Sequence, residues 1–129
     1  MSGWIWLDER DALALHGRSL AAHGGGVGLR DPGLLASALA RPQQRVAYEA
    51  SPDTIELAAA YAAGVVRNHP FIDGNKRTGF LLGVLFLELN GFRFTADEVA
   101  ATRAVLDLAA GALDEVGYCA FLRAHSAPA

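Results

Sequence analysis

The stretch from Thr78 to Leu87, TGFLLGVLFL, carries no charge and constrains the fold more than any other part of the chain. A helix over residues 74–90 would be apolar on every side between Gly79 and Leu87, so other elements must surround it. The stretch is only about half as long as a bilayer-spanning helix requires. We therefore predict a compact helical bundle around one buried central helix.

Composition favours a single folded domain. Hydrophobic residues make up 52% of the 129 residues and charged residues 19%, which excludes a disordered chain and supplies a core. The formal net charge is −3, without a basic stripe, so neither nucleic acid nor an anionic membrane is an expected partner. Asp8, Glu9 and Arg10 interrupt the only apolar residues near the start, so no secretory signal is expected. These features predict a cytoplasmic protein.

Capping residues and helix breakers divide the rest of the chain into further helices. The predicted starts carry caps at Asp8, Asp31, Ser51 and Thr95, and proline follows two of these caps. The predicted helices cover residues 8–23, 31–41, 51–68, 74–90, 95–111 and 114–125. The fold class is therefore all-α, with about six helices.

Residues 42–50, PQQRVAYEA, are predicted to interrupt the helices. Pro42 ends the second predicted helix, and the segment carries no helical cap. Val46 and Tyr48 favour extended backbone. We expect a short extended flap or hairpin here, and a second short extended connection at residues 92–94.

The loop HPFIDGNKR, residues 69–77, gathers the groups that phosphate transfer needs. Free N–H groups and the dipole at the start of the next helix favour an anion near Gly74 and Asn75. Lys76 and Arg77 add positive charge where helix starts ordinarily carry acidic residues. Each feature alone could be a turn residue or a solvated face, but their density favours a phosphate or nucleotide site.

Four other residues of this loop have candidate roles. Asp73 is its only acidic group and could hold a magnesium ion that bridges phosphates, or could cap the next helix. His69 is the candidate general base, because imidazole exchanges protons near neutral pH. The alternative for His69 is a hydrogen-bonded residue at a helix end. Pro70 would stiffen the loop, and Phe71 would enter the core and hold His69 in place.

Features outside the loop are interpreted structurally. Trp4 and Trp6 precede the first helix and are expected to pack on its start, with a partner surface as the alternative. The single cysteine, Cys119, lies in a late apolar segment and is interpreted as a core residue, not a nucleophile. The remaining histidines lack metal-ligand spacing and are assigned no role: His16, His23 and His125.

The run HPFIDGNKR resembles the motif of the Fic/Doc family, HxFx(D/E)xN(G/K)R, at every fixed position. The glycine-rich loop before Asp31, residues 44–49, and Asn90-Gly91 resemble the Doc (death-on-curing) branch. The resemblance extends from about Leu7 to Leu122 and implies a single Fic/Doc domain over residues 1–129.

The resemblance implies a role for each matching position. His69 would be the catalytic base and Asp73 the ligand of Mg²⁺, with ATP as the donor. The nucleotide phosphates would be held by Gly74, Asn75, Lys76 and Arg77. The flap would align the target's hydroxyl segment by pairing as an added strand, through Arg45, Val46, Ala47 and Tyr48.

Lys76 indicates which phosphate is transferred. Most Fic proteins have glycine here and attach AMP to a hydroxyl side chain, whereas the Doc branch shares the lysine. That branch implies a toxin that phosphorylates a Ser or Thr hydroxyl of a translation elongation factor. AMP transfer remains the alternative, because Pro70 and Gly74 follow the form of AMP-transferring Fic proteins. A non-catalytic binding module is disfavoured by the intact His69 and Asp73.

Regulation is expected to come from a second protein. Self-inhibited Fic proteins carry an (S/T)xxxE(G/N) motif whose glutamate pairs with a second arginine of the loop. The sequence lacks this motif, and its loop has only Arg77. The resemblance therefore implies inhibition in trans by an antitoxin.

Overall fold

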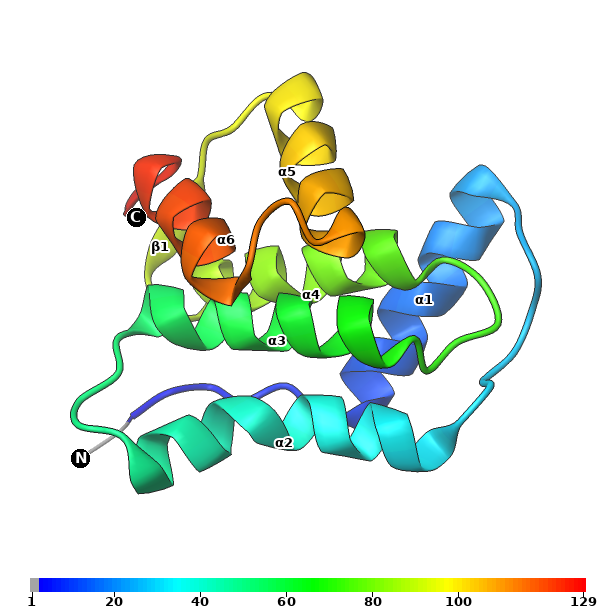
Figure 1. Ribbon diagram of the computed structural model, residues 1–129, viewed down its shortest axis with the longest axis horizontal. Coiled ribbons are helices and arrows are strands. Elements are labelled where there is room, and N and C mark those ends of the chain that lie inside the picture. Colours follow the sequence, from blue (N-terminus) through cyan, green and yellow to red (C-terminus); the bar gives the residue numbers. More distant parts are fainter. Residues whose placement is uncertain (1–2) are drawn as a thin grey trace.

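The computed structural model describes residues 3–129, which form six helices and a two-stranded sheet (Figure 1). In chain order the elements are α1 (Glu9–His23), α2 (Pro32–Tyr48), α3 (Thr54–Asn68), α4 (Asn75–Leu89), β1 (Phe92–Phe94), α5 (Glu98–Ala110), α6 (Glu115–Ala124) and β2 (Ser126–Pro128). The prediction of an all-α bundle is confirmed. Every helix except α4 starts at an aspartate whose carboxylate accepts a backbone N–H of the first turn.

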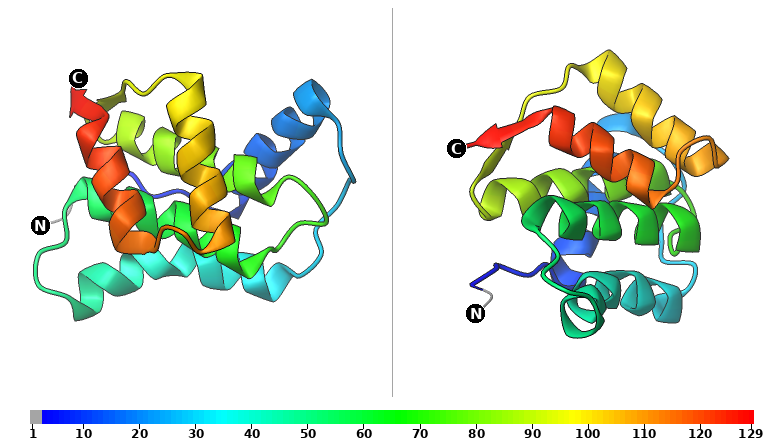
Figure 2. Two further views of the ribbon diagram at one scale, coloured as in Figure 1. Left: turned by 45° about the horizontal axis from the view of Figure 1, so that its top comes forward. Right: turned by 60° about the vertical axis from the view of Figure 1, so that its left-hand side comes forward.

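The buried central helix is α3, so the prediction that residues 74–90 fill this place is wrong. Every residue from Leu57 to Val66 is buried, and α3 packs against α2, α4, α5 and α6 (Figures 1 and 2). Its alanine-rich surface lets helices approach closely on several sides. Helix α4 is less deeply buried than α3: Phe80, Leu81, Val84 and Leu85 are only half-buried, and Leu89 at its end is exposed. Within residues 3–129 no helix is long and apolar enough to cross a bilayer.

Glycines bring the backbones of α3 and α4 together. A Cβ at Gly79 would lie 2.9 Å from Cγ2 of Val66 and 3.0 Å from the carbonyl oxygen of Ala62. A Cβ at Gly83 would lie 3.2 Å from the carbonyl oxygen of Ala58. These two glycines therefore set the spacing between the helices that flank the candidate loop.

Helix α2 continues to Tyr48, so the predicted extended flap over residues 42–50 is wrong. Pro42 lies inside this helix and is fully buried. It extends, at helical spacing, the buried stripe formed by Leu35, Ala38 and Leu39. Burial of this stripe, with the ion pairs of Arg45, outweighs the roughly 3 kcal/mol that proline costs inside a helix.

Two helices begin later than predicted. The cap of α3 is Asp53, not Ser51, and the cap of α5 is Asp97, not Thr95. Each aspartate accepts the N–H of the residue three positions on, at 2.8 Å. A carboxylate is a stronger acceptor than a hydroxyl, so the aspartate two residues further along sets the start.

The extended segment predicted at residues 92–94 is confirmed as β1. It pairs antiparallel with β2, an interaction that was not predicted, and thereby ties the C-terminal segment to the end of α4 (Figure 2). The Phe94 ring packs edge-on against Phe80 of α4 and Phe121 of α6. This contact fixes the position of β1 beside the start of α5.

The tryptophans, which were predicted to pack on the start of the first helix, pack on the core through α3 and α4. The indole N–H of Trp4 donates to Oγ1 of Thr54 at 2.9 Å, and the ring centroids of Trp6 and Phe86 are 5.8 Å apart. Cys119 is half-buried against the core, and burial raises the pKa of its thiol. A raised pKa disfavours the thiolate, in agreement with a structural role.

Candidate active site

The loop between α3 and α4 is anchored in the core by Phe71, as predicted. The Phe71 side chain is completely buried. The Asn75 side chain brackets its backbone: Nδ2 donates to the Phe71 carbonyl and Oδ1 accepts the Phe71 N–H, both at 2.9 Å. Asn75 is itself buried. Its amide side chain is thus committed to the loop, and only its backbone N–H is left for a phosphate.

His16 is a residue of this site that sequence analysis missed. Its buried ring stacks on Phe71, with centroids 3.8 Å apart and planes 10° apart. Its Nε2 lies 2.7 Å from the carbonyl oxygen of Asp73. A carbonyl only accepts, so Nε2 carries the proton. No local pattern could reveal this contact, because His16 and Asp73 are 57 residues apart in sequence.

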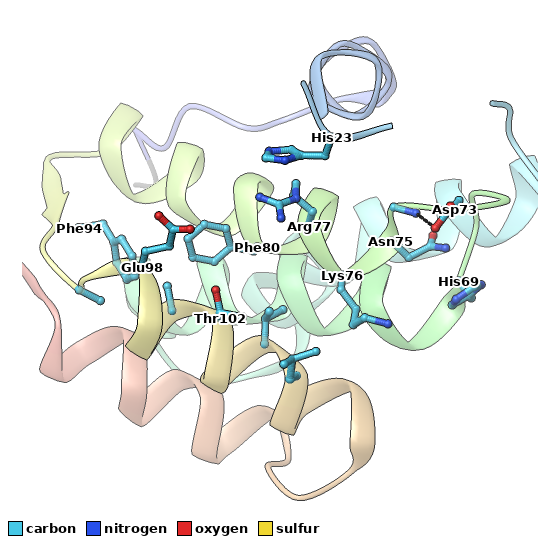
Figure 3. Close-up of a pocket in the computed structure, with 15 residues that line it drawn as sticks. His23, His69, Asp73, Asn75, Lys76, Arg77, Phe80, Phe94, Glu98 and Thr102 are labelled. Atoms are coloured by element: carbon cyan, nitrogen blue, oxygen red, sulfur yellow. Dashed lines mark hydrogen bonds between the residues drawn. The ribbon is translucent and has the colours of Figure 1, made fainter. Parts of the chain in front are cut away.

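His69 ends α3 in a left-handed conformation, with φ 54° and ψ 52°. This region is uncommon for any residue with a Cβ, and Pro70 further disfavours a helical backbone at the preceding residue. Strained residues of this kind concentrate at functional sites. The His69 side chain is exposed and lines a pocket (Figure 3). The geometry therefore suits a base more than the hydrogen-bonded helix-end residue that was its alternative.

Asp73 is exposed, and backbone N–H groups hold its carboxylate. Gly26 donates to Oδ2 at 3.2 Å and Gly74 donates to Oδ1 at 2.8 Å. These two hydrogen bonds, with a smaller effect of Lys76, lower the pKa of the Asp73 carboxyl. Asp73 does not cap α4, since the N-cap residue is Gly74 and no side chain caps this helix. An ionised carboxylate with lone pairs to spare is available to a cation.

The start of α4 differs from every other helix start in the protein. It has no side-chain cap, whereas each of the other five helices is capped by an aspartate, and like α2 it has no acidic residue in its first turn. Lys76 and Arg77 are exposed there, and no carboxylate of residues 3–129 forms an ion pair with either. Free N–H groups, the positive end of the helix dipole and two cations are the features that favour a bound anion.

These groups open into one pocket of about 690 Å³ between the start of α4 and α5 (Figure 3). The loop and the start of α4 contribute polar groups of His69, Asp73, Gly74, Asn75, Lys76 and Arg77, and α5 contributes Glu98 and Thr102. The apolar wall includes Phe80, Phe94, Val105 and Leu106. His23, which was assigned no role, points into the same pocket toward Arg77 (Figure 3). The volume falls within the range of small-molecule and cofactor sites.

The donor set of the pocket fits magnesium. Mg²⁺ typically binds through one or two carboxylates together with substrate phosphates. Asp73 supplies one ionised carboxylate. Within residues 3–129 no group of three or more His, Cys, Asp or Glu side chains forms a ready-made metal cage. A magnesium ion held here would therefore share its coordination between Asp73 and a bound phosphate chain.

The residues predicted to align a target do not lie at this site. Arg45, Val46, Ala47 and Tyr48 form the end of α2 and do not line the pocket. The Arg45 guanidinium is instead paired with Glu49, Glu56 and Glu115. The β-favouring pair of Val46 and Tyr48 was overridden by helical packing.

The segment beside the loop is the connection between α1 and α2. Leu29 forms an isolated antiparallel bridge with Phe71. The N–H of Ile72 donates to the Gly28 carbonyl at 3.1 Å. A backbone segment therefore pairs with the loop through one isolated bridge, but it comes from residues 28–31 and not from residues 42–50.

The fold and the site define a class of helical domain in which an uncapped, cation-bearing helix start opens into a pocket of the size that cofactors occupy. Residues 6–87, well over half of the chain, match the model of the Fic/DOC family, and the protein belongs to this family. It is 38% identical over 95 residues to "Protein kinase doc" of Escherichia phage P1, covering 73% of this chain and 75% of that protein. It is 41% identical over 93 residues to "Toxin Doc" of Mycolicibacterium smegmatis, covering 71% of this chain and 69% of that protein.

Proposed function

We propose that this Doc-like toxin is a transferase that moves the γ-phosphoryl group of Mg-ATP to a Ser or Thr hydroxyl of a protein. The observation that carries the proposal is the shared pocket of His69 and the cation-bearing start of α4. A phosphate chain bound at the start of α4 would lie beside the one exposed histidine whose backbone is strained. The phage relative named a protein kinase supports the same reaction.

His69 and the start of α4 divide the chemistry between them. His69 accepts the hydroxyl proton as the oxygen forms a bond to the γ-phosphorus, while the bond from that phosphorus to the β,γ-bridging oxygen breaks and ADP leaves. Lys76, Arg77 and the free N–H groups of α4 bind the phosphate oxygens and stabilise their developing charge. Asp73 would hold Mg²⁺, which when bound neutralises phosphate charge.

Lys76 supports γ-transfer over AMP transfer. It lines the pocket, is exposed and forms no ion pair within residues 3–129. A lysine in place of glycine fills space that an α-phosphate would otherwise enter and puts charge beside the transferred group. AMP transfer is the competing outcome, since Pro70 and Gly74 match the form of AMP-transferring Fic proteins.

The target's hydroxyl segment would lie against residues 26–29. Leu29 of this segment forms the bridge with Phe71 of the loop, and Val27 is 81% exposed. Ile72, 55% exposed, flanks it. A target segment could add as a strand here, with its side chains against these two residues. We propose a translation elongation factor as the target, and an antitoxin bound in trans as the inhibitor, in line with the relative named a toxin.

ATP labelled separately at the α- and γ-phosphates tests the proposal. The protein, free of antitoxin, is incubated with Mg²⁺ and one of the two labelled forms of ATP. The target is supplied as a purified bacterial elongation factor or as bacterial lysate. We expect γ-label on protein; α-label would establish AMP transfer instead, and no label on any protein would contradict both reactions. His69→Ala should lower transfer by at least about 10²-fold. Its circular dichroism should stay unchanged, because the side chain is exposed.

A further inference from the structure

Arg30 makes unusual contacts for an exposed arginine. Within residues 3–129 it has no carboxylate partner. Its Nε donates to the His69 carbonyl at 2.7 Å, and its Nη2 donates to the Asn68 carbonyl at 3.0 Å. The last carbonyls of a helix lack partners within the helix and carry its negative dipole end. The guanidinium therefore satisfies the C-terminal end of α3.

The backbone of the same segment holds the next carbonyl. The N–H groups of Arg30 and Asp31 both donate to the Pro70 carbonyl, at 2.7 Å and 2.9 Å. Three consecutive carbonyls, those of residues 68–70, thus accept hydrogen bonds from two neighbouring residues. The peptide planes on both sides of His69 are fixed from outside the loop.

His69 needs this external hold. Its left-handed backbone is disfavoured by its own Cβ and again by the ring of Pro70, which pushes the preceding residue toward extended conformations. Released from its contacts, the backbone would rotate toward that extended region. The Cβ of His69 would then point elsewhere, and the imidazole would leave its place beside the start of α4.

We infer that Arg30 is a positioning residue that keeps the His69 imidazole in its reactive place by holding the backbone of residues 68–70. Its consequence for catalysis rests on the proposed function, in which His69 is the base. The effect of Arg30 on the His69 backbone does not depend on the proposed function. Arg30 does not line the pocket, so its loss should change turnover and not ATP binding.

Three variants separate this role from a general effect of charge. Arg30→Ala removes both side-chain hydrogen bonds, whereas Arg30→Lys keeps the charge but loses the planar fork. Arg67→Ala is the matched control, since Arg67 is exposed on the last turn of α3 and makes no side-chain hydrogen bond or ion pair within residues 3–129. We expect Arg30→Ala to lower kcat about tenfold with KM for ATP within about twofold, Arg30→Lys to lie between, and Arg67→Ala to match the wild type.

Nuclear magnetic resonance gives a readout that needs no activity. A positive φ brings a residue's own Hα close to its amide proton, so His69 should give a strong intraresidue cross-peak between them in wild type and Arg67→Ala. We expect this cross-peak to weaken in Arg30→Ala. An unchanged cross-peak, or an unchanged kcat, in a folded Arg30→Ala would overturn the inference. If the wild type transfers no phosphate, the proposed function fails, and the cross-peak still decides the role of Arg30; if Arg30→Ala does not fold, Arg30→Lys decides it.

Discussion

Two groups of cations in this protein have opposite surroundings. Arg45, near the end of α2, pairs with three glutamates, two of them on other helices, and Arg41 also pairs with Glu115. We call Arg41, Arg45, Glu49, Glu56 and Glu115 the Arg45 cluster. Lys76 and Arg77, at the start of α4, have no carboxylate partner within residues 3–129.

The helix dipole increases the contrast. A cation at the end of α2 interacts favourably with that helix, whereas a cation at the start of α4 is opposed by its own helix. The Arg45 cluster is complete within the fold. The start of α4 has cations and N–H groups without partners within residues 3–129, as expected if an anion binds there. Pairing, and not the mere presence of arginine and lysine, therefore separates a structural cluster from a binding site.

The largest expected effect that tests the difference between these two groups of cations is that of removing Arg77. We expect Arg77→Ala to lower phosphoryl transfer by about 10²- to 10³-fold, the loss seen in other enzymes when one hydrogen-bond donor of an oxyanion hole is removed. Because Arg77 pairs with no carboxylate, the urea midpoint of unfolding should stay within error of the wild type. A loss of stability as large as the loss of Arg45 causes would contradict the assignment.

Arg45→Ala should have the converse effect. Its side chain is 20% exposed, and the truncation leaves the carboxylates of Glu49 and Glu56 without this partner, whereas Glu115 keeps its ion pair with Arg41. We expect the free energy of unfolding to fall by roughly 1–3 kcal/mol, measured by urea titration. The kcat of the protein that remains folded should match the wild type. A large fall in kcat would restore the predicted role of Arg45 at the target.

Tripolyphosphate should stabilise the protein through the start of α4. A ligand at ten times its Kd adds about 1.4 kcal/mol to the free energy of unfolding. We expect this gain in a thermal shift assay on the wild type and on Arg45→Ala. Arg77→Ala should show a smaller gain at the same concentration. Equal gains in all three proteins would place the anion elsewhere.

Lys76→Ala is expected to change stability less than Arg45→Ala does, and in the opposite direction. Without a bound anion, this change removes a charge that opposes the dipole of α4, so the free energy of unfolding should rise by about 0.3–1 kcal/mol. Urea titration at low ionic strength measures it, and high salt should abolish the difference. Destabilisation by Lys76→Ala would show that the lysine has a structural partner.

The smallest effect concerns the acid that lies near these cations. Backbone N–H groups lower the folded-state pKa of the Asp73 carboxyl below its ordinary value. The unfolded chain therefore binds a proton first as the pH falls, and the contribution of Asp73 to stability, complete above its ordinary pKa, is lost as pH falls through the lower folded value. Asp73→Asn should reduce the acid-induced loss of stability in this range. An identical pH profile would contradict the role of the N–H groups.

Local patterns predicted the elements that local interactions determine. The starts of α1 and α2 at Asp8 and Asp31, the buried Phe71 and the stop of α5 at Gly111 follow from capping, side-chain size and backbone freedom, each of which acts over a few residues. The composition of the loop also predicted which groups line the pocket. These properties depend on residues that are close together in the sequence.

Long-range packing decided the rest. Pro42 stays helical because its ring completes a buried stripe. The sequence around Arg45 indicates a surface cation, whereas in the folded protein it forms ion pairs with three glutamates. The places of His16 and Arg30 depend on contacts across 57 and 39 residues. A single sequence does not reveal such pairings.

Gly79 helps to set the spacing between His69 and the cations at the start of α4. Since even one methyl group at this position would collide with Val66 and Ala62, the two helices that carry the base and the cations have no room to slide past each other. The distance between proton acceptor and phosphate cradle is thus set when the chain folds. In the proposed function, a donor nucleotide would bind a loop that is already ordered, and the entropic cost of assembling the reactive groups would be met during folding.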